Sequence, residues 1–373
     1  MLGVVAAVAA ASAAALGQLP GAAGCLNRSG SSGCAAARAV ANPLAVAASR
    51  DGKSLYATGG IGSLGGAGVF ARDPATGKLR QLAGRAGCLS RVPSRACRSG
   101  RGLETPAAVA VSPDGRRVAI AGRNGRSIGL YRRNASGALT ATGCFQTQAT
   151  PGCRETAGLQ QVSALAFSPN GEVLVAGSRA GLVSFTYDAG RLSFAEFVPT
   201  KGAVALAFTR DSAFLYAVGG GGERGWMDVF ELDTDGQMNR IQCVEQGEPA
   251  GCQAASGLRQ PEGVALSPDG RRVYVASSVS GAVDVFERNE TGAVAAPQVV
   301  KNPALAGATG IAVRGDRVYV TSRKIVTELR RSGSSLRVAG SFRPRGVSDL
   351  RALAVAGRNL YVAGHGIAIL RIS

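Results

Sequence analysis

Residues 261–277 read PEGVALSPDGRRVYVAS, and this stretch decides the fold. It opens with a short run of small apolar residues, turns at Ser267-Pro268-Asp269-Gly270, and continues as a second run with alternating character. An Asp-Gly pair between two such runs is the strongest short-range signal for a β-hairpin. The stretch therefore predicts two antiparallel strands joined by a tight turn.

The same pattern recurs along the chain. A third strand follows it, as at 282–287, and then a turn containing Gly292 and a weaker fourth strand. Small residues on the first strand of a four-stranded repeat are typical of a propeller blade, because the innermost strands crowd around the axis. We therefore predict an all-β fold, a seven-bladed β-propeller of four-stranded antiparallel blades, spanning 15–373 as a single domain. Its seven copies of the hairpin lie at 43–59, 106–122, 163–177, 203–219, 261–277, 309–322 and 351–364.

The last copy has sequence for only three strands before the chain ends at Ser373. The missing fourth strand is expected at the N-terminus, where residues 15–25 (ALGQLPGAAGC) match residues 78–88 (KLRQLAGRAGC) at the end of the first full blade. We expect a strand near 15–22 to pair with the C-terminal blade and close the ring.

The eight cysteines form four Cys-x8-Cys pairs. Successive turns lie more than 50 residues apart only where such a pair intervenes, so each pair is interpreted as an insertion between the fourth strand of one blade and the first strand of the next. Zinc sites favour shorter cysteine spacings with histidines nearby, and the chain has a single His. The spacing predicts no metal site, but four local disulfides in an oxidising compartment: Cys25–Cys34, Cys88–Cys97, Cys144–Cys153 and Cys243–Cys252.

The N-terminal residues 1–14 form a signal-peptide-like apolar segment, within the run MLGVVAAVAAASAAAL. It is too short to span a bilayer, and it lacks the basic residues that usually begin a signal peptide. A lipid-attachment motif ending at Cys25 is rejected, because the repeat pairs this cysteine with Cys34. No other stretch is apolar enough to cross a membrane, so we expect no membrane span in the mature chain and a secreted or extracellular, cell-envelope protein.

The net charge is +18, from 42 Lys and Arg against 24 Asp and Glu. Two explanations stay open: an anionic partner, or an arginine-rich but merely solvated surface. The basic residues occur singly or in pairs, such as Arg271-Arg272, and aromatic residues do not alternate with them as base-stacking platforms. Nucleic acid is therefore not expected as a partner, whereas an anionic cell-surface glycan is. We expect a monomer.

The residues Val273-Tyr274-Val275-Ala276-Ser277 and Val318-Tyr319-Val320-Thr321-Ser322 resemble the YVTN repeat. Together with the Ser-Pro-Asp-Gly turns, they are similar over nearly the whole chain to the lactonase-type seven-bladed propellers, a family that includes 6-phosphogluconolactonases. The Cys-x8-Cys insertions depart from the cytoplasmic lactonases and resemble secreted, cysteine-bearing propellers of actinobacterial type. The resemblance implies lactone hydrolysis by His, Arg and carboxylates near the central channel, but no family catalytic set maps onto this chain.

Few residues suggest other chemistry. His365 is the only histidine and the only catalytic candidate. The segment 233–236 (DTDG) faintly resembles a calcium loop but lacks the remaining ligands, so it is interpreted as a turn. The glycine-rich segments 59–68 and 219–225 lack the Lys-Ser/Thr of a phosphate-binding loop. No cofactor is expected.

Propellers usually bind partners on the face that carries the loops between second and third strands, here called the loop face. Trp226, the only tryptophan, follows a glycine-rich loop and either stacks on a sugar or peptide or packs between blades. The leading hypothesis is a non-catalytic binding or scaffold module for a protein or anionic glycan, and the alternative is a lactone hydrolase at the channel mouth. A channel lined by Ala and Val favours the first, and a cluster of His365 with carboxylates and Arg favours the second. The predicted binding residues are Arg123, Arg126, Arg179, Arg224, Trp226, Arg323, Lys324 and His365.

Overall fold

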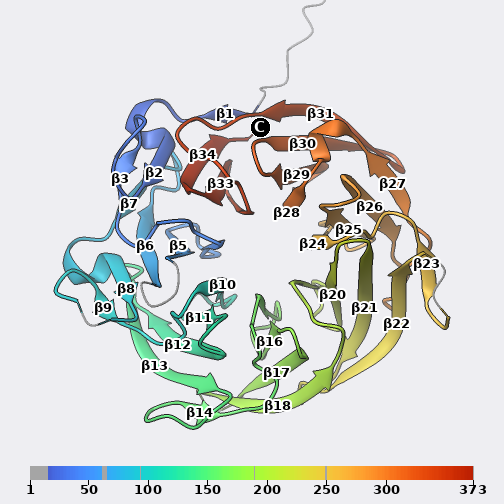
Figure 1. Ribbon diagram of the computed structural model, residues 1–373, viewed down its shortest axis with the longest axis horizontal. Coiled ribbons are helices and arrows are strands. Elements are labelled where there is room, and N and C mark those ends of the chain that lie inside the picture. The colour runs from blue at the N-terminus through green and yellow to red at the C-terminus, as the bar shows by residue number, and fades with distance from the viewer. Residues whose placement is uncertain (1–15, 61–64, 93, 189, 248–249, 373) are drawn as a thin grey trace, which may run out of the picture.

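The computed structural model describes residues 16–60, 65–92, 94–188, 190–247 and 250–372. They form a ring of seven β-sheets around a central axis (Figure 1). The predicted seven-bladed propeller is therefore confirmed, whereas the apolar segment 1–14 lies outside the described residues. Within those ranges no helix is both long and apolar enough to cross a bilayer.

Each blade runs outward from its innermost strand, and we number the blades in the order of these strands along the chain. The innermost strands are β4 (Ala45–Ala48), β10 (Pro106–Val111), β15 (Ala164–Phe167), β19 (Ala205–Phe208), β24 (Pro261–Leu266), β28 (Ala308–Arg314) and β32 (Ala352–Ala356). The second strands are β5 (Ser54–Gly59), β11 (Arg117–Gly122), β16 (Val173–Gly177), β20 (Phe214–Gly221), β25 (Arg272–Ser277), β29 (Arg317–Ser322) and β33 (Asn359–Gly364).

The outer half of each blade is more variable in length. The third strands are β6 (Gly66–Arg72), β12 (Ser127–Arg133), β17 (Gly181–Asp188), β21 (Arg224–Leu232), β26 (Ala282–Glu287), β30 (Val326–Ser332) and β34 (Gly366–Arg371). In five blades the fourth strand is continuous: β13 (Leu139–Gln146), β18 (Arg191–Pro199), β22 (Met238–Gln246), β27 (Gln298–Lys301) and β31 (Ser335–Phe342).

The turn that identified the repeat is held by its serine. The Ser267 hydroxyl donates to Asp269 Oδ1 at 2.5 Å and accepts from the Arg272 amide at 2.9 Å. Gly270 occupies the left-handed region at φ +70°, which favours glycine. This geometry explains why Ser, Asp and Gly recur together at the inner hairpins.

The N-terminal segment closes the ring, as the sequence predicted. Strand β1 (Gly17–Gln18) pairs antiparallel with β34, with Gly17 opposite Arg371. After one turn of 3-10 helix, η1 (Gly21–Gly24), strand β2 (Cys25–Asn27) continues along the same partner. The first blade repeats this interruption in β7 (Leu79–Gln81), η3 (Gly84–Gly87) and β8 (Cys88–Ser90), which explains the match between 15–25 and 78–88.

All four predicted disulfides are present, and no described cysteine is free. The cysteine loops differ from a plain insertion, because the first cysteine of each pair belongs to the fourth strand itself. The second cysteine leads into a short fifth strand that runs parallel to the fourth, because the ten-residue loop brings the chain back beside the residues that follow the first cysteine. These fifth strands are β3 (Ala35–Ala36), β9 (Arg98–Ser99), β14 (Arg154–Glu155) and β23 (Gln253–Ala255).

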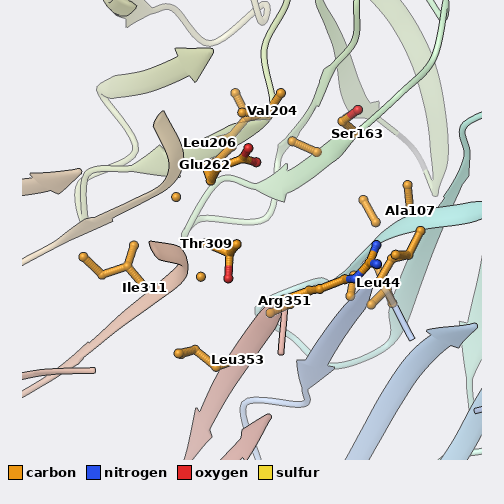
Figure 2. Close-up of a pocket in the computed structure, with 18 of the residues that line it drawn as sticks. Leu44, Ala107, Ser163, Val204, Leu206, Glu262, Thr309, Ile311, Arg351 and Leu353 are labelled. Atoms are coloured by element: carbon orange, nitrogen blue, oxygen red, sulfur yellow. The ribbon is translucent and has the colours of Figure 1, made fainter. Parts of the chain in front are cut away.

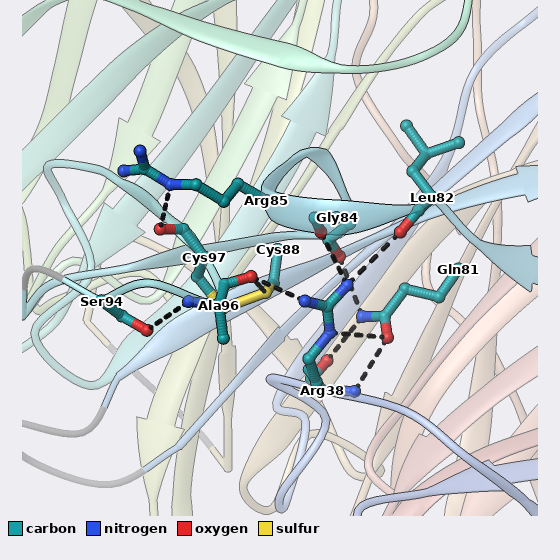
Figure 3. Close-up of a disulfide and its surroundings, with 10 residues drawn as sticks. Arg38, Gln81, Leu82, Gly84, Arg85, Cys88, Ser94, Ala96 and Cys97 are labelled. Atoms are coloured by element: carbon teal, nitrogen blue, oxygen red, sulfur yellow. Dashed lines mark hydrogen bonds between the residues drawn. A yellow bond between two sulfur atoms is a disulfide. The ribbon is translucent and has the colours of Figure 1, made fainter.

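Cysteine loops also connect neighbouring blades. Figure 3 shows Arg38, from the connection that precedes the first blade, beside the Cys88–Cys97 loop. Its guanidinium donates to the Ala96 carbonyl at 2.6 Å and to the Gly84 carbonyl at 2.8 Å. The loop face is therefore stiffened by hydrogen bonds as well as by covalent links.

Candidate functional site

The innermost strands enclose a cavity of about 550 Å³ at one mouth of the central channel (Figure 2). Each blade contributes a residue within one position of the start of its first strand, and the wall below is formed by small and aliphatic side chains such as Ala108, Ala164 and Ile311. Because these strands begin where the connections between blades end, the cavity opens on the loop face. The strand-start residues are Leu44, Ala107, Ser163, Val204, Glu262, Thr309 and Arg351.

Three arginines and two carboxylates line this cavity. Arg351 Nε donates to Asp349 Oδ2 at 3.0 Å, and this hydrogen bond holds the pKa of Asp349 below its usual value. Glu262 Oε1 accepts from Gln260 Nε2 at 2.8 Å. Both carboxylates are therefore engaged by neighbouring side chains.

The other two arginines, Arg123 and Arg323, form no ion pair with any described residue. Arg123 is half-buried, and its Nε is fully buried with no hydrogen-bond acceptor among the described residues. Arg323 is exposed at the same mouth. A buried donor without an acceptor is unfavourable unless a ligand or water pairs with it. The cavity lining thus carries three arginines against two carboxylates, a net excess of one positive charge.

His365 lies beside this cavity and is not among its lining residues. Its Nδ1 is 3.1 Å from the Ser348 hydroxyl and its Nε2 is 3.8 Å from Asp349 Oδ2. Its side chain is 53% exposed. Asp349 therefore joins His365 to Arg351, and the mouth carries one imidazole–carboxylate–guanidinium cluster on the seventh blade.

The eight predicted binding residues do not form one site. Arg123 and Arg323 share the channel cavity, and His365 borders it. Arg126, Arg179 and Lys324 are exposed on loops, and Arg224 is exposed at the start of β21, all outside the cavity lining.

Of the two alternatives for Trp226, the structure shows packing between blades. The residue is 4% exposed and packs among apolar residues between the third and fourth blades, such as Val175 and Leu182. Its indole lies next to Gly219 of β20, where an added Cβ would come within 2.6 Å of the ring, so glycine at this position makes room for it.

The sequence did not single out Asp349, Arg351 or Glu262. Their only signal was a charged residue at or near the start of an inner strand, as in PEGVAL and RALAV. The segment 233–236 is a turn, in which the Gly236 amide donates to the Asp233 carbonyl at 3.2 Å. In the described ranges no group of three or more His, Cys, Asp or Glu side chains is placed to hold a metal ion.

Comparison with known proteins supports the fold of the chain more strongly than any activity. Residues 153–185 match the model of the WD domain, G-beta repeat. No curated protein matches the chain. All the solved structures below are at most 20% identical to it, so they support the fold alone.

A candidate 6-phosphogluconolactonase from Bacteroides uniformis is 20% identical and has a TM-score of 0.64, covering 81% of this chain and 86% of its own. The periplasmic gluconolactonase of Pseudomonas aeruginosa is 20% identical with a TM-score of 0.62, over 83% and 87%. Hydrazine synthase from Kuenenia stuttgartiensis is 15% identical with a TM-score of 0.65, over 90% and 97%. The chain is thus a seven-bladed β-propeller with lactonases among its structural neighbours and a WD-repeat match within its second and third blades.

Proposed function

We propose that this protein is a secreted, non-catalytic binding propeller whose channel mouth receives an anionic group of a glycan. The observation that carries the proposal is the pair Arg123 and Arg323, which line one cavity without an ion-pair partner among the described residues. The formal net charge of +18 adds a long-range attraction for anions. The four disulfides support an oxidising compartment, where such glycans occur.

The shape of the cavity favours a glycan over a protein partner. A concave site of about 550 Å³ falls in the range of small-ligand pockets, whereas protein partners bind over broad, flatter surfaces. A terminal or single acidic sugar fits such a site, with its carboxylate near the two arginines and its ring against the aliphatic wall.

Calorimetric titration with galacturonic acid and its trimer, at low and moderate salt, tests this function. We expect saturable binding that weakens with salt, and a loss of about tenfold or more in Arg123→Gln and in Arg323→Gln, because hydrogen bonds to charged groups are strong. Arg271→Gln is the matched control, since Arg271 is exposed in an inner hairpin turn at the opposite end of the strands. An equal loss of affinity in all three variants would mean that binding depends only on the net charge, and it would refute a channel site.

Lactone hydrolysis is the second candidate function, favoured by the cluster of Ser348, His365, Asp349 and Arg351. In that reaction His365 takes a proton from water as the water oxygen bonds to the lactone carbonyl carbon. The ring C–O bond then breaks, the ring oxygen takes up a proton, and a hydroxy acid is released. The arginines would stabilise the negative oxygen of the intermediate.

A pH-stat assay with glucono-δ-lactone separates the two functions. Binding alone predicts no hydrolysis above the buffer rate, because His365 is exposed and lies outside the cavity lining. Hydrolysis that disappears in His365→Ala, and survives in Arg271→Gln, would replace the binding proposal with an enzymatic one.

A further inference from the structure

A second cavity, of about 300 Å³, lies at the border between the third and fourth blades. It shares no lining residue with the channel cavity. We call it the border pocket. It is lined by Pro199, Thr200, Lys201, Trp226, Asp228, Arg240 and Glu245.

The border pocket exists where a cysteine loop is missing. Before the fifth blade, the chain returns from such a loop and lays Gly257 so close to Asp284 that an added Cβ would lie 1.8 Å from its Oδ1. Asp228 occupies the equivalent position in the fourth blade, since it pairs with Ala217 as Asp284 pairs with Val275. The third blade ends in β18 without a fifth strand, so the short connection at Thr200 and Lys201, and no cysteine loop, borders the pocket beside Asp228.

Two polar side chains at this pocket are buried, and one of them, the indole of Trp226, has no hydrogen bond among the described residues. Asp228 is 5% exposed, and its nearest charged partner is Arg240, whose Nη1 lies 3.7 Å from Oδ1. The indole Nε1 of Trp226 is also buried and has no acceptor. A buried polar group of this kind is unfavourable until a partner satisfies it. An unpaired indole N–H and an ion-paired carboxylate therefore lie two residues apart on the same face of β21.

The rest of the lining carries balanced charge. Lys201 Nζ forms an ion pair with Glu245 Oε1, and Arg240 faces Asp228, so two cations oppose two carboxylates. A free ion gains little from a site whose net charge is zero. A ligand with several hydroxyl groups can donate to the carboxylates and accept from the cations and the indole at once.

We propose that the border pocket binds a neutral sugar residue, whose hydroxyls pair with Asp228 and Trp226. The volume lies at the small end of ligand pockets, which suits a single ring rather than a chain. Burial raises the pKa of Asp228 to about 6, and a hydroxyl that donates to the carboxylate would favour its charged form. The site is separate from the acidic-sugar site at the channel mouth and does not depend on it.

Trp226 makes the test direct, because it is the only tryptophan of the chain and it lines the pocket. Its fluorescence is followed while D-glucose, D-galactose, D-mannose and N-acetyl-D-glucosamine are titrated separately into the intact protein. We expect a saturable change with at least one sugar. Asp228→Asn is expected to weaken that binding about tenfold or more. Asp284→Asn, the same change at the equivalent position of the next blade, is expected to leave it unchanged.

The proposal is overturned if none of the four sugars gives a saturable change, or if Asp228→Asn binds as tightly as the unchanged protein. A response to acetate or ethylammonium in place of the sugars would also overturn it, since it would identify an ion site. Thermal unfolding of each variant checks its folding, and Thr200→Val tests the same pocket if Asp228→Asn does not fold. Arg323→Gln is expected to bind the neutral sugar as tightly as the unchanged protein. The test of the border pocket is therefore independent of the test of the channel site.

Discussion

Asp228 and Asp284 show how one residue type at equivalent positions acquires different chemistry from its surroundings. Asp228 borders a pocket, whereas Asp284 is fully buried, with both carboxylate oxygens lacking a hydrogen bond among the described residues. Gly257 packs against it, and Lys301 exerts the main opposing charge. Burial raises the pKa of Asp284 to about 7, so the folded protein holds a proton here that the unfolded chain releases.

This difference predicts a pH-dependent stability that Asp284→Asn removes. Because the pKa rises on folding, the stabilisation by the bound proton is complete below the unfolded value of 3.8 and is lost as pH rises to about 7. At pH 8 the charged carboxylate is buried without a partner, and we expect Asp284→Asn to unfold at higher urea concentration than the unchanged protein. At pH 4 the two should be similar. Asp235→Asn, in an exposed turn, is the control, and an equal shift in both variants would contradict the assignment.

Trp226 marks the limit of prediction at the residue scale. A lone aromatic after a glycine-rich loop has the same local sequence whether it faces solvent or the neighbouring blade. Its position depends on residues distant in sequence, such as Val175 and Leu182 of the neighbouring blade, against which it packs. Single-residue patterns do not contain that information.

At the scale of the elements, neighbouring blades are joined by a hydrogen bond that recurs at several places around the ring. The buried hydroxyl of Tyr216 in β20 donates to the Gly292 carbonyl in the fifth blade at 2.6 Å. Tyr56 and Tyr361 make the same contact, with Gly137 and Gly77 of the blades that follow them. The turn between the third and fourth strands of one blade is thus held by the second strand of the blade before it.

Tyr216→Phe should therefore destabilise the protein by about 1–3 kcal/mol, because it leaves a buried carbonyl without its donor. Tyr319 supplies the matched control. It is equally buried at the equivalent place in the sixth blade, but its hydroxyl has no hydrogen-bond partner among the described residues. Tyr319→Phe should be neutral or slightly stabilising in urea unfolding. A similar loss in both variants would mean that packing of the ring, and not the hydrogen bond, joins the blades.

Strands were predicted better than the site, because a strand depends on neighbouring residues whereas the site depends on residues far apart in the sequence. Each hairpin is encoded within about 17 residues, and the Ser267 and Gly270 geometry repeats from blade to blade. The fifth strand was missed because two or three residues such as Arg154–Glu155 carry no pattern of their own, and they pair only because the disulfide returns them to the fourth strand. Asp349 and Arg351 line the same cavity as Arg123 only because the ring closes, and no short stretch of sequence encodes that proximity.

For the whole molecule, the ring is completed by a short N-terminal segment. Leu16 and Leu19 are buried against the last blade, and the Leu19 amide donates to the Ile369 carbonyl at 3.0 Å. Gln18 adds two bonds to Arg345, one to its carbonyl at 3.0 Å and one from its amide at 2.7 Å. A closed ring shares its stability among all its blades, so the joint between the last blade and this segment is where it is expected to open first.

Removal of residues 1–20 should consequently lower the unfolding free energy by about 3–6 kcal/mol, from the lost burial of Leu16 and Leu19 at about 1.5–3 kcal/mol each. Removal of residues 1–14 is the control, because it leaves β1 and both leucines in place. Urea unfolding compares the two, and hydrogen exchange at β34 reports whether that strand loses protection first. Equal stability of the two truncated proteins would mean that β2, held by the Cys25–Cys34 loop, closes the ring alone.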